Sequence, residues 1–309
     1  MNHPYPILVT GAAGKVGAIG PSVVSDLLRR GFKVRAMVRR EDERSQALAS
    51  LGAEVVVGNL LDLHDVHRAV EGCRRVYFSL SVDSTYLEAT TNVAAVARHH
   101  GVEAFVNMSQ MTLSQMSVLE TTDSPQHKQH WLAEQVLQWS GLPVVYLRPT
   151  AFMDVFFLRF CAPTVRQNDA LLLPFGDGRT SPIAAVDVAR CVAAVLADPD
   201  AHIGRVYNLT GPSVCGLDEI ALEYSRALGR EIRYVNVPIK PWEERVRQTA
   251  ASPHLAEHLI AMAALHRAGR YDRYTEDVQL LTGAPPMSIE GFVRLHAAAF
   301  TRTAVSQLA

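Results

Sequence analysis

A glycine-rich turn near the start of the chain is the feature that most limits how it can fold. Residues 7–17 read Ile-Leu-Val-Thr-Gly-Ala-Ala-Gly-Lys-Val-Gly, so apolar residues typical of a short buried strand precede glycines spaced three apart. Glycine lets the backbone approach a ligand closely, and the free N–H groups at the start of a following helix attract an anion. The spacing differs from the Gly-x-Gly-x-x-Gly of the dinucleotide fingerprint. The stretch nevertheless predicts a strand, a phosphate-binding turn and a helix.

The residues after the turn complete a βαβ unit. Val23, Val24, Leu27 and Leu28 recur at helical spacing, and residues 33–38 form a second apolar strand pattern. Pro21 interrupts the helix, because proline lacks the N–H that a helix interior requires. We expect the helix either to kink or to begin again at Pro21.

Strands and helices then alternate along the first half of the chain. The predicted strands cover residues 54–58, 75–80, 104–109 and 143–147, and the predicted helices cover residues 41–51, 63–72, 86–100 and 126–140. This alternation favours a parallel sheet with helices on both faces and right-handed crossovers. We therefore predict a doubly wound α/β fold of the Rossmann type.

The alternation ends after residue 149. Residues 187–196, 217–228 and 288–300 are predicted helices, residues 205–211 a late strand that returns to the sheet, and residues 241–282 helical without a motif. We divide the chain into a Rossmann domain of residues 1–155, joined by that strand, and a smaller, mainly helical substrate-binding lobe of residues 156–309. The apolar and aromatic run at 152–160 forms either plain core or a wall of the substrate pocket.

Composition excludes several classes of function. The formal net charge is −1 and 20% of residues are charged, so the chain offers no basic field for nucleic acid and no polybasic membrane patch. Four scattered cysteines suggest neither a disulfide framework nor a zinc site, and no metal is expected. Without a leader pattern or a membrane-spanning apolar run, we expect a cytoplasmic protein that acts on a small molecule, with a homodimer as one expected arrangement.

The end of the second strand indicates which cofactor the turn would hold. Arginine at this position suits the 2′-phosphate of NADP(H), whereas an acidic side chain would suit the 2′-hydroxyl of NAD(H). The chain has Arg39 and Arg40 there, and Lys15 lies in the glycine turn. We therefore predict NADP(H) in preference to NAD(H); the alternative, strongest for Arg40, is that these arginines are simply solvated.

Other polar residues follow the remaining strands. Asn59 follows the third strand, Ser79 and Ser81 end the fourth, and Ser109 ends the fifth. Ligands of open α/β sheets bind at these carboxyl ends, although such residues also cap turns.

Several of these segments together resemble a known family. The Thr-Gly-Ala-Ala-Gly-Lys-Val-Gly turn, the second strand Val-Arg-Ala-Met-Val-Arg, and the stretch from Glu134 through Arg148-Pro149 to Met153 are similar to the NmrA-like branch of the atypical short-chain dehydrogenase/reductases. The resemblance implies NAD(P)H binding. Its members include quinone, azo-dye and triphenylmethane reductases, and also NADP-sensing regulators without catalysis. The expected cofactor contacts are Thr10, Gly11, Ala13, Gly14, Lys15, Val16, Gly17, Arg39, Asn59, Leu60, Ser79, Leu80, Ser81, His130, Pro149 and Phe152.

The chain departs from the wider superfamily at the Tyr-x-x-x-Lys pair that supplies the proton in classical members. By register those two positions are Gln126 and His130, and no tyrosine is followed by lysine four residues later. His130 could donate a proton or bind a ribose hydroxyl, with Gln126 on the same helical face and Ser109 nearby. The alternative is a structural histidine. Lys128 is two residues out of register.

These features predict an NADPH-preferring oxidoreductase that transfers hydride to a conjugated or aromatic acceptor such as a quinone. An acceptor that spreads negative charge over a π-system needs less help from a strong acid, in keeping with the missing pair. Two alternatives remain: a non-catalytic NADP(H)-sensing regulator, and an isomerase or epimerase that retains its cofactor.

Overall fold

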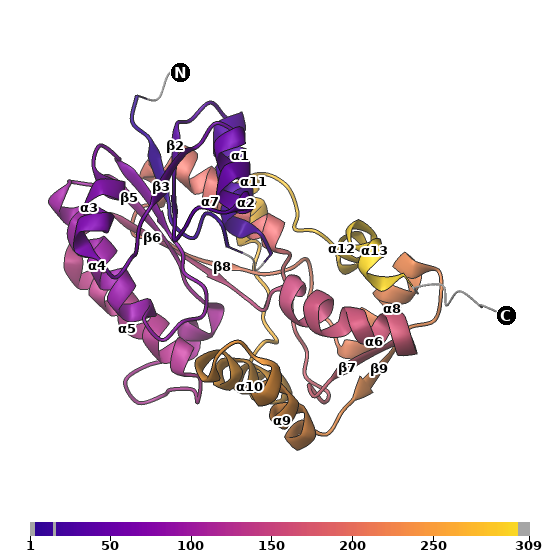
Figure 1. Cartoon of the computed structure of the whole chain (residues 1–309). Coiled ribbons are helices and arrows are strands. Elements are labelled where there is room, and N and C mark those ends of the chain that lie inside the picture. The colour runs from indigo at the N-terminus through magenta and orange to yellow at the C-terminus, as the bar shows by residue number, and fades with distance from the viewer. Residues whose placement is uncertain (1–3, 15–16, 302–309) are drawn as a thin grey trace.

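A parallel sheet of seven strands forms the centre of the molecule (Figure 1). The structure is a computed structural model that describes residues 4–14 and 17–301 of the 309-residue chain. The strand order is β3-β2-β1-β4-β5-β6-β8, and every neighbouring pair is parallel. This is the predicted doubly wound Rossmann topology, with the order reversing next to β1. The strands are β1 (Ile7–Val9), β2 (Val34–Val38), β3 (Glu54–Val57), β4 (Arg75–Phe78), β5 (Ala104–Met108), β6 (Val144–Pro149) and β8 (Val206–Leu209).

Helices cover both faces of this sheet. On one face lie α1 (Ile19–Arg29), α2 (Glu43–Ser50) and α7 (Ala185–Ala197), with α11 (Asp277–Thr282) packed on α7; on the other lie α3 (Leu63–Val70), α4 (Tyr86–His99) and α5 (Pro125–Ser140). Each face has its own apolar core. The central strands β1, β4 and β5 are nearly fully buried. They are apolar because helices cover them on both sides.

The second lobe has a third apolar core and a small sheet of its own. It contains a π-helical segment (Asp154–Phe160), α6 (Cys161–Asn168), α8 (Leu217–Leu228), α9 (Ile239–Thr249), α10 (Pro253–Arg267), α12 (Ile289–Leu295) and α13 (Ala297–Phe300). Strands β7 (Ala170–Leu173) and β9 (Arg233–Asn236) pair in parallel. Figure 1 shows α10 beside the lower end of α5 with α9 next to α10, and α6, α8 and α12 grouped at the far side of the lobe.

The structure differs from the sequence-based expectations at several points. Helix α1 begins at Ile19, so Pro21 stands in its first turn, where an N–H has no helical partner anyway. The helix thus begins two residues before the proline and does not restart at it. Residues 288–300 form two short helices instead of one. The strands β7 and β9 were not expected, since Leu171 to Leu173 is too short an apolar run to separate from a helix by pattern.

Chain segments after residue 155 also build the Rossmann half. Helix α7 packs on α1, and α11 packs on α7 and β8. Val188, Val192 and Leu196 of α7 belong to the same core as β1 and β2. The domain boundary at residue 155 stays a prediction. Helices α7 and α11, and not only the late strand β8, pack in the Rossmann half although they follow that boundary. None of the helices in the described part of the chain combines the length and apolar character needed to cross a membrane.

Candidate functional site

The glycine turn lies tightly against the first helix. A Cβ atom on Gly20 of α1 would lie 2.3 Å from the Gly11 carbonyl oxygen and 2.8 Å from Ala12 Cα, so only glycine fits at that crossing. Gly11 has φ +62° and lies so close to Ser79 that a Cβ would meet its carbonyl oxygen at 2.7 Å. Gly17 instead packs against Ala185 at the start of α7. The glycines thus bring the turn, β4 and α1 together.

The amino terminus of α1 is open. No side chain caps it, and its first turn carries no acidic residue. Ile19 and Gly20, whose N–H groups begin the helix, line a cavity, as do Gly11 and Gly14 of the turn. Unpaired N–H groups and the positive end of a helix dipole form a site for a phosphate or pyrophosphate.

This cavity has a volume of about 480 Å³ and joins the two halves of the molecule. Its floor is formed by the carboxyl ends of β4, β5 and β6, and its far side by the 152–163 segment and by α9 and α10. It lies where ligands of open α/β sheets bind, outside the strand ends at the reversal of strand order. Residues from both halves would therefore touch the same ligand.

The structure places about half of the predicted site residues along the cavity. Those that line it are Gly11, Gly14, Ser79, Leu80, Ser81, Ser109, Pro149 and Phe152. The described residues Thr10, Ala13, Gly17, Arg39, Asn59, Leu60, Gln126 and His130 are not part of the lining, and Lys15 and Val16 lie outside the described residues. The assignment of these residues to a cofactor or to catalysis stays a prediction.

Thr10, although outside the lining, helps to hold the glycine turn in place. The Thr10 hydroxyl donates to the Ser79 carbonyl at 3.0 Å and accepts from the Ser79 N–H at 2.9 Å, which fixes the ends of β1 and β4 together. The Asn59 side chain caps a turn by accepting from the Leu61 N–H.

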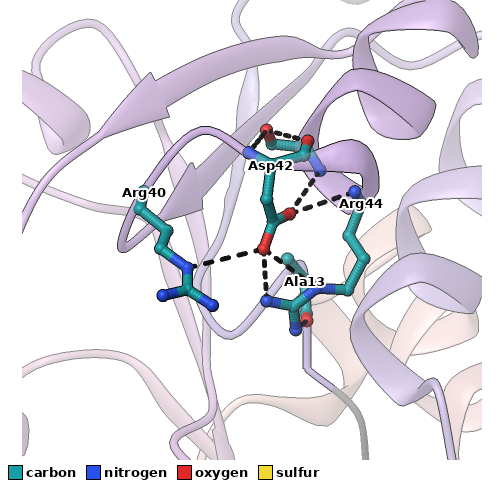
Figure 2. Close-up of polar contacts among 5 residues, drawn as sticks. Ala13, Arg40, Asp42 and Arg44 are labelled. Atoms are coloured by element: carbon teal, nitrogen blue, oxygen red, sulfur yellow. Dashed lines mark hydrogen bonds and ion pairs between the residues drawn. The ribbon is translucent and has the colours of Figure 1, made fainter.

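Arg39, Arg40 and Arg44 lie at the loop between β2 and α2, and Figure 2 shows the last two with Asp42. Arg44 donates to the Ala13 carbonyl of the glycine turn at 2.6 Å and to Asp42 at 2.5 Å, and Arg40 reaches Asp42 at 3.6 Å. The hydrogen bonds from Arg44 are the largest cause that lowers the Asp42 pKa, to about 2. Arg39 is exposed and has no hydrogen bond or ion pair within the described ranges. It is the guanidinium free to meet another anion.

The aromatic run at 152–160 is both core and pocket wall. Phe152, Phe156 and Phe160 line the cavity at intervals of four, as one face of a helical segment does. Phe156 is fully buried in the core of the second lobe, and its ring stacks on Phe160 with centroids 5.8 Å apart. The sequence left core and pocket wall as two alternatives for this run, and Phe156 belongs to both.

Ser109 is held by a buried ion pair. Its hydroxyl donates to Glu134 at 2.5 Å, and Arg148 donates to both carboxylate oxygens of Glu134. Ser109 lines the cavity, and its exposed fraction is 2%. Because its proton is engaged by a carboxylate, its oxygen is presented to the cavity as an acceptor.

Gln126 and His130 lie deeper than the cavity. Gln126 accepts from the Asp83 N–H at 3.3 Å and contacts His254 of α10 at 2.7 Å. The His130 ring lies 3.9 Å from that of Tyr86, and within the described residues its buried Nδ1 has no hydrogen-bond partner. Burial, with a smaller effect of His258, lowers the His130 pKa to about 3. The imidazole is therefore neutral at pH 7, as a structural histidine would be.

Several polar residues of the cavity escaped the sequence analysis, among them Tyr271 and His258. Tyr271 and His258 come from the motif-free stretch after residue 241, and both line the cavity. The Tyr271 hydroxyl accepts from Thr112 at 3.4 Å, and burial raises its pKa to about 12. His258 contacts the Ser124 hydroxyl at 2.8 Å, and burial lowers its pKa well below the usual value. Only the folding of α10 over the strand ends brings them here, so no local pattern could reveal them.

A group of three histidines lies elsewhere. His67 of α3 meets His99 and His100 at the end of α4, and their candidate ligand atoms lie within 4.8 Å of one another. None of them lines the cavity. The expectation that the chain binds no metal stays a prediction.

The strand order, the glycine turn and a cavity at the reversal of strand order define a Rossmann-fold protein. The chain belongs to the NmrA-like family, whose model matches residues 5–290. It is 26% identical to the NAD(P)H azoreductase of Xenophilus azovorans, over 93% of this chain and 97% of the relative. It is 30% identical to the (4-alkanoyl-5-oxo-2,5-dihydrofuran-3-yl)methyl phosphate reductase of Streptomyces griseus, over 95% of this chain and 99% of that one.

A solved structure supports the same fold. The NADPH-dependent quinone oxidoreductase of Escherichia coli, complexed with NADPH, superposes with a TM-score of 0.81 at 23% identity, covering 94% of this chain and 99% of that one. The relatives named here are all reductases, so the chain falls among NAD(P)H-dependent oxidoreductases.

The buried histidines predict a pH-dependent stability. His127 and His130 have folded-state pKa values of about 3, below the ordinary value of 6.5. As the pH falls through 6.5, the unfolded chain binds protons that the folded chain refuses. The contribution of these groups to the free energy of unfolding is therefore greatest above pH 6.5. As the pH is lowered from 6.5 to about 3, it falls by about 1.4 kcal/mol per pH unit for each group.

Urea titrations at several pH values would measure this loss, and His130→Gln should make the dependence on pH shallower. The exposed His64→Gln serves as a control that leaves it unchanged. An identical pH dependence in wild type and His130→Gln would show that His130 is not buried as a neutral group.

Proposed function

We propose that this protein is an NADPH-preferring reductase of conjugated or aromatic acceptors such as quinones. The observation that carries the proposal is one continuous cavity, which begins at the glycine turn and the open amino terminus of α1 and ends at the aromatic wall of Phe152, Phe156 and Phe160. A dinucleotide and a flat acceptor would therefore meet within one enclosure, and positioning two reactants in this way turns their encounter into a unimolecular step.

The residues at the glycine turn fit a dinucleotide. A Cβ on Gly14 would meet only the Gly11 carbonyl, at 3.0 Å, so the Gly14 backbone is open toward the cavity. The α1 amino terminus would receive the pyrophosphate, and the strand-end residues Ser79, Leu80 and Ser81 would border the rest of the cofactor. When bound, the reduced cofactor supplies a hydride.

The far end of the cavity fits an apolar, flat acceptor. Val155, Phe156, Leu259 and Met262 line it from two sides. Aromatic and thioether side chains stack on or adapt to planar molecules. The azoreductase and quinone oxidoreductase relatives are named for acceptors with extended π-systems, which favours an acceptor of the same kind here.

Among the described residues that line the cavity, none is a strong acid that could protonate the product. His258 is neutral at pH 7, Tyr271 has a pKa of about 12, and the Ser109 proton is engaged by Glu134. We therefore assign the proton to water, with the Tyr271 hydroxyl as a hydrogen-bond donor toward a developing oxyanion. His130 lies outside the cavity lining, which favours its structural role over a catalytic one. A quinone tolerates this arrangement because its reduced form spreads the charge it receives.

The preference for NADPH rests on Arg39. Among the described residues Arg39 has no hydrogen bond or ion pair, whereas Arg40 and Arg44 already contact Asp42. A 2′-phosphate beside this strand end would gain a charge-assisted hydrogen bond from Arg39.

Anaerobic single-turnover mixing tests the reaction class. Enzyme loaded with NADPH and mixed with 1,4-naphthoquinone or a related quinone should lose the absorbance of reduced nicotinamide in one exponential phase. Between pH 6 and 8, this rate should depend on pH in the same way in wild type and in His130→Gln. If no acceptor in a panel of quinones and azo compounds oxidises the cofactor, the protein is instead an NADP(H) sensor, or an isomerase that retains its cofactor.

The Arg39→Gln variant tests the cofactor preference. We expect KM for NADPH to rise about tenfold with little change for NADH, because one charge-assisted contact to the phosphate is lost. Arg40→Gln is the matched control, since its guanidinium is engaged by Asp42, and it should change neither value much. Equal losses with NADPH and NADH in Arg39→Gln would refute the role given to this side chain.

A further inference from the structure

Two arginines stand in the substrate half of the cavity. Arg159 belongs to the π-helical segment and Arg245 to α9, and both line the cavity. The two elements meet there, because the Phe160 and Trp242 rings lie 6.0 Å apart and these residues are within one helical turn of the arginines. Arg159 and Arg245 therefore line the cavity from two neighbouring elements, next to the aromatic wall.

Neither guanidinium has a partner among the residues that the structure describes. In the described ranges no hydrogen bond or ion pair involves the side chain of Arg159 or Arg245, although most other arginines are paired. The nearby acids are engaged or turned elsewhere: Asp154 accepts from the Ala185 N–H at 2.9 Å, and Glu243 pairs with Arg247. Both residues are exposed to solvent as well as lining the cavity, so their charges are available to an anion bound there.

The rest of the cavity does not neutralise them. Among the described residues that line it there is no aspartate, glutamate or lysine, and His258 is neutral at pH 7. The substrate half thus combines apolar and aromatic surface with a formal charge of +2 from Arg159 and Arg245. Such a field attracts anions and repels cations.

We propose that the acceptor carries an anionic group, a carboxylate, sulfonate or phosphate, which Arg159 and Arg245 bind while its flat ring lies along the phenylalanine wall. This inference rests on the proposed function and adds the substrate's charge to it. A planar guanidinium binds the oxygens of all three groups in a bidentate manner and stacks on aromatic rings, so it suits an aromatic anion at this place. Cationic dyes should be poor acceptors.

The test compares a sulfonated quinone with its neutral parent. For 1,2-naphthoquinone-4-sulfonate and 1,2-naphthoquinone, the ratio of kcat/KM values is measured in wild type, Arg159→Gln, Arg245→Gln and the double variant. Comparing the ratio between variants cancels the different intrinsic reactivity of the two quinones. We expect each single change to lower the ratio roughly fivefold and the double change to lower it further. Added salt should lower it in wild type.

Arg166→Gln is the matched control. Arg166 lies in α6, has no side-chain partner in the described ranges and does not line the cavity, so its loss should leave the ratio unchanged. A ratio that stays the same in the double variant, or falls as much in Arg166→Gln, overturns the inference.

A binding measurement separates this inference from the proposed function. Naphthalene-2-sulfonate cannot accept a hydride, and calorimetry should show that it binds wild type and loses most of its affinity in the double variant. If wild type reduces no quinone but shows this pattern, the proposed function fails and the anion site stands. If quinones are reduced but the sulfonate binds wild type and the double variant equally, the anion site fails alone.

Discussion

The structure depends on the close crossing of α1 over the glycine turn. At Gly20 no side-chain atom fits between the helix and the backbone of Gly11 and Ala12, and this contact brings the start of α1 down to the carboxyl end of β1. The same contact leaves the first N–H groups of the helix uncapped and facing the cavity. The packing of α1 and the anion site thus depend on the same contact. A larger residue at position 20 would move the start of the helix away from the glycine turn and from the cavity.

The Rossmann half could be predicted from the sequence because its signals are local. Apolar strands such as Ile7–Val9 and Ala104–Met108, each followed by a helical pattern, specify a parallel sheet almost without reference to the rest of the chain. The serines at the strand ends were predicted for the same reason, as their position follows from the strand. The sequence did not show how deeply each of these side chains is buried. Gln126 and His130 share a helical face as expected, but α10 covers that face, so both are buried away from the cavity lining.

The second lobe was predicted only in outline, and this limit has a physical cause. Tyr271, His258 and Arg245 reach the cavity because α9 and α10 fold back across the strand ends, which no spacing in residues 241–282 reveals. The cofactor half therefore follows from patterns that the fold requires, whereas the acceptor half depends on long-range packing. Charge adds what pattern could not, since Arg159 and Arg245 give the acceptor half of the cavity a positive charge that no acidic residue of the described lining offsets.

The central claim is that the glycine turn and the start of α1 form a dinucleotide site. Calorimetric titration of the purified protein with NADPH and with NADH tests it most directly. We predict one saturable site per chain, tighter for NADPH, that is lost when Gly20→Ala forces α1 away from the turn. Absence of saturable binding of either nucleotide to the wild-type protein would contradict the account.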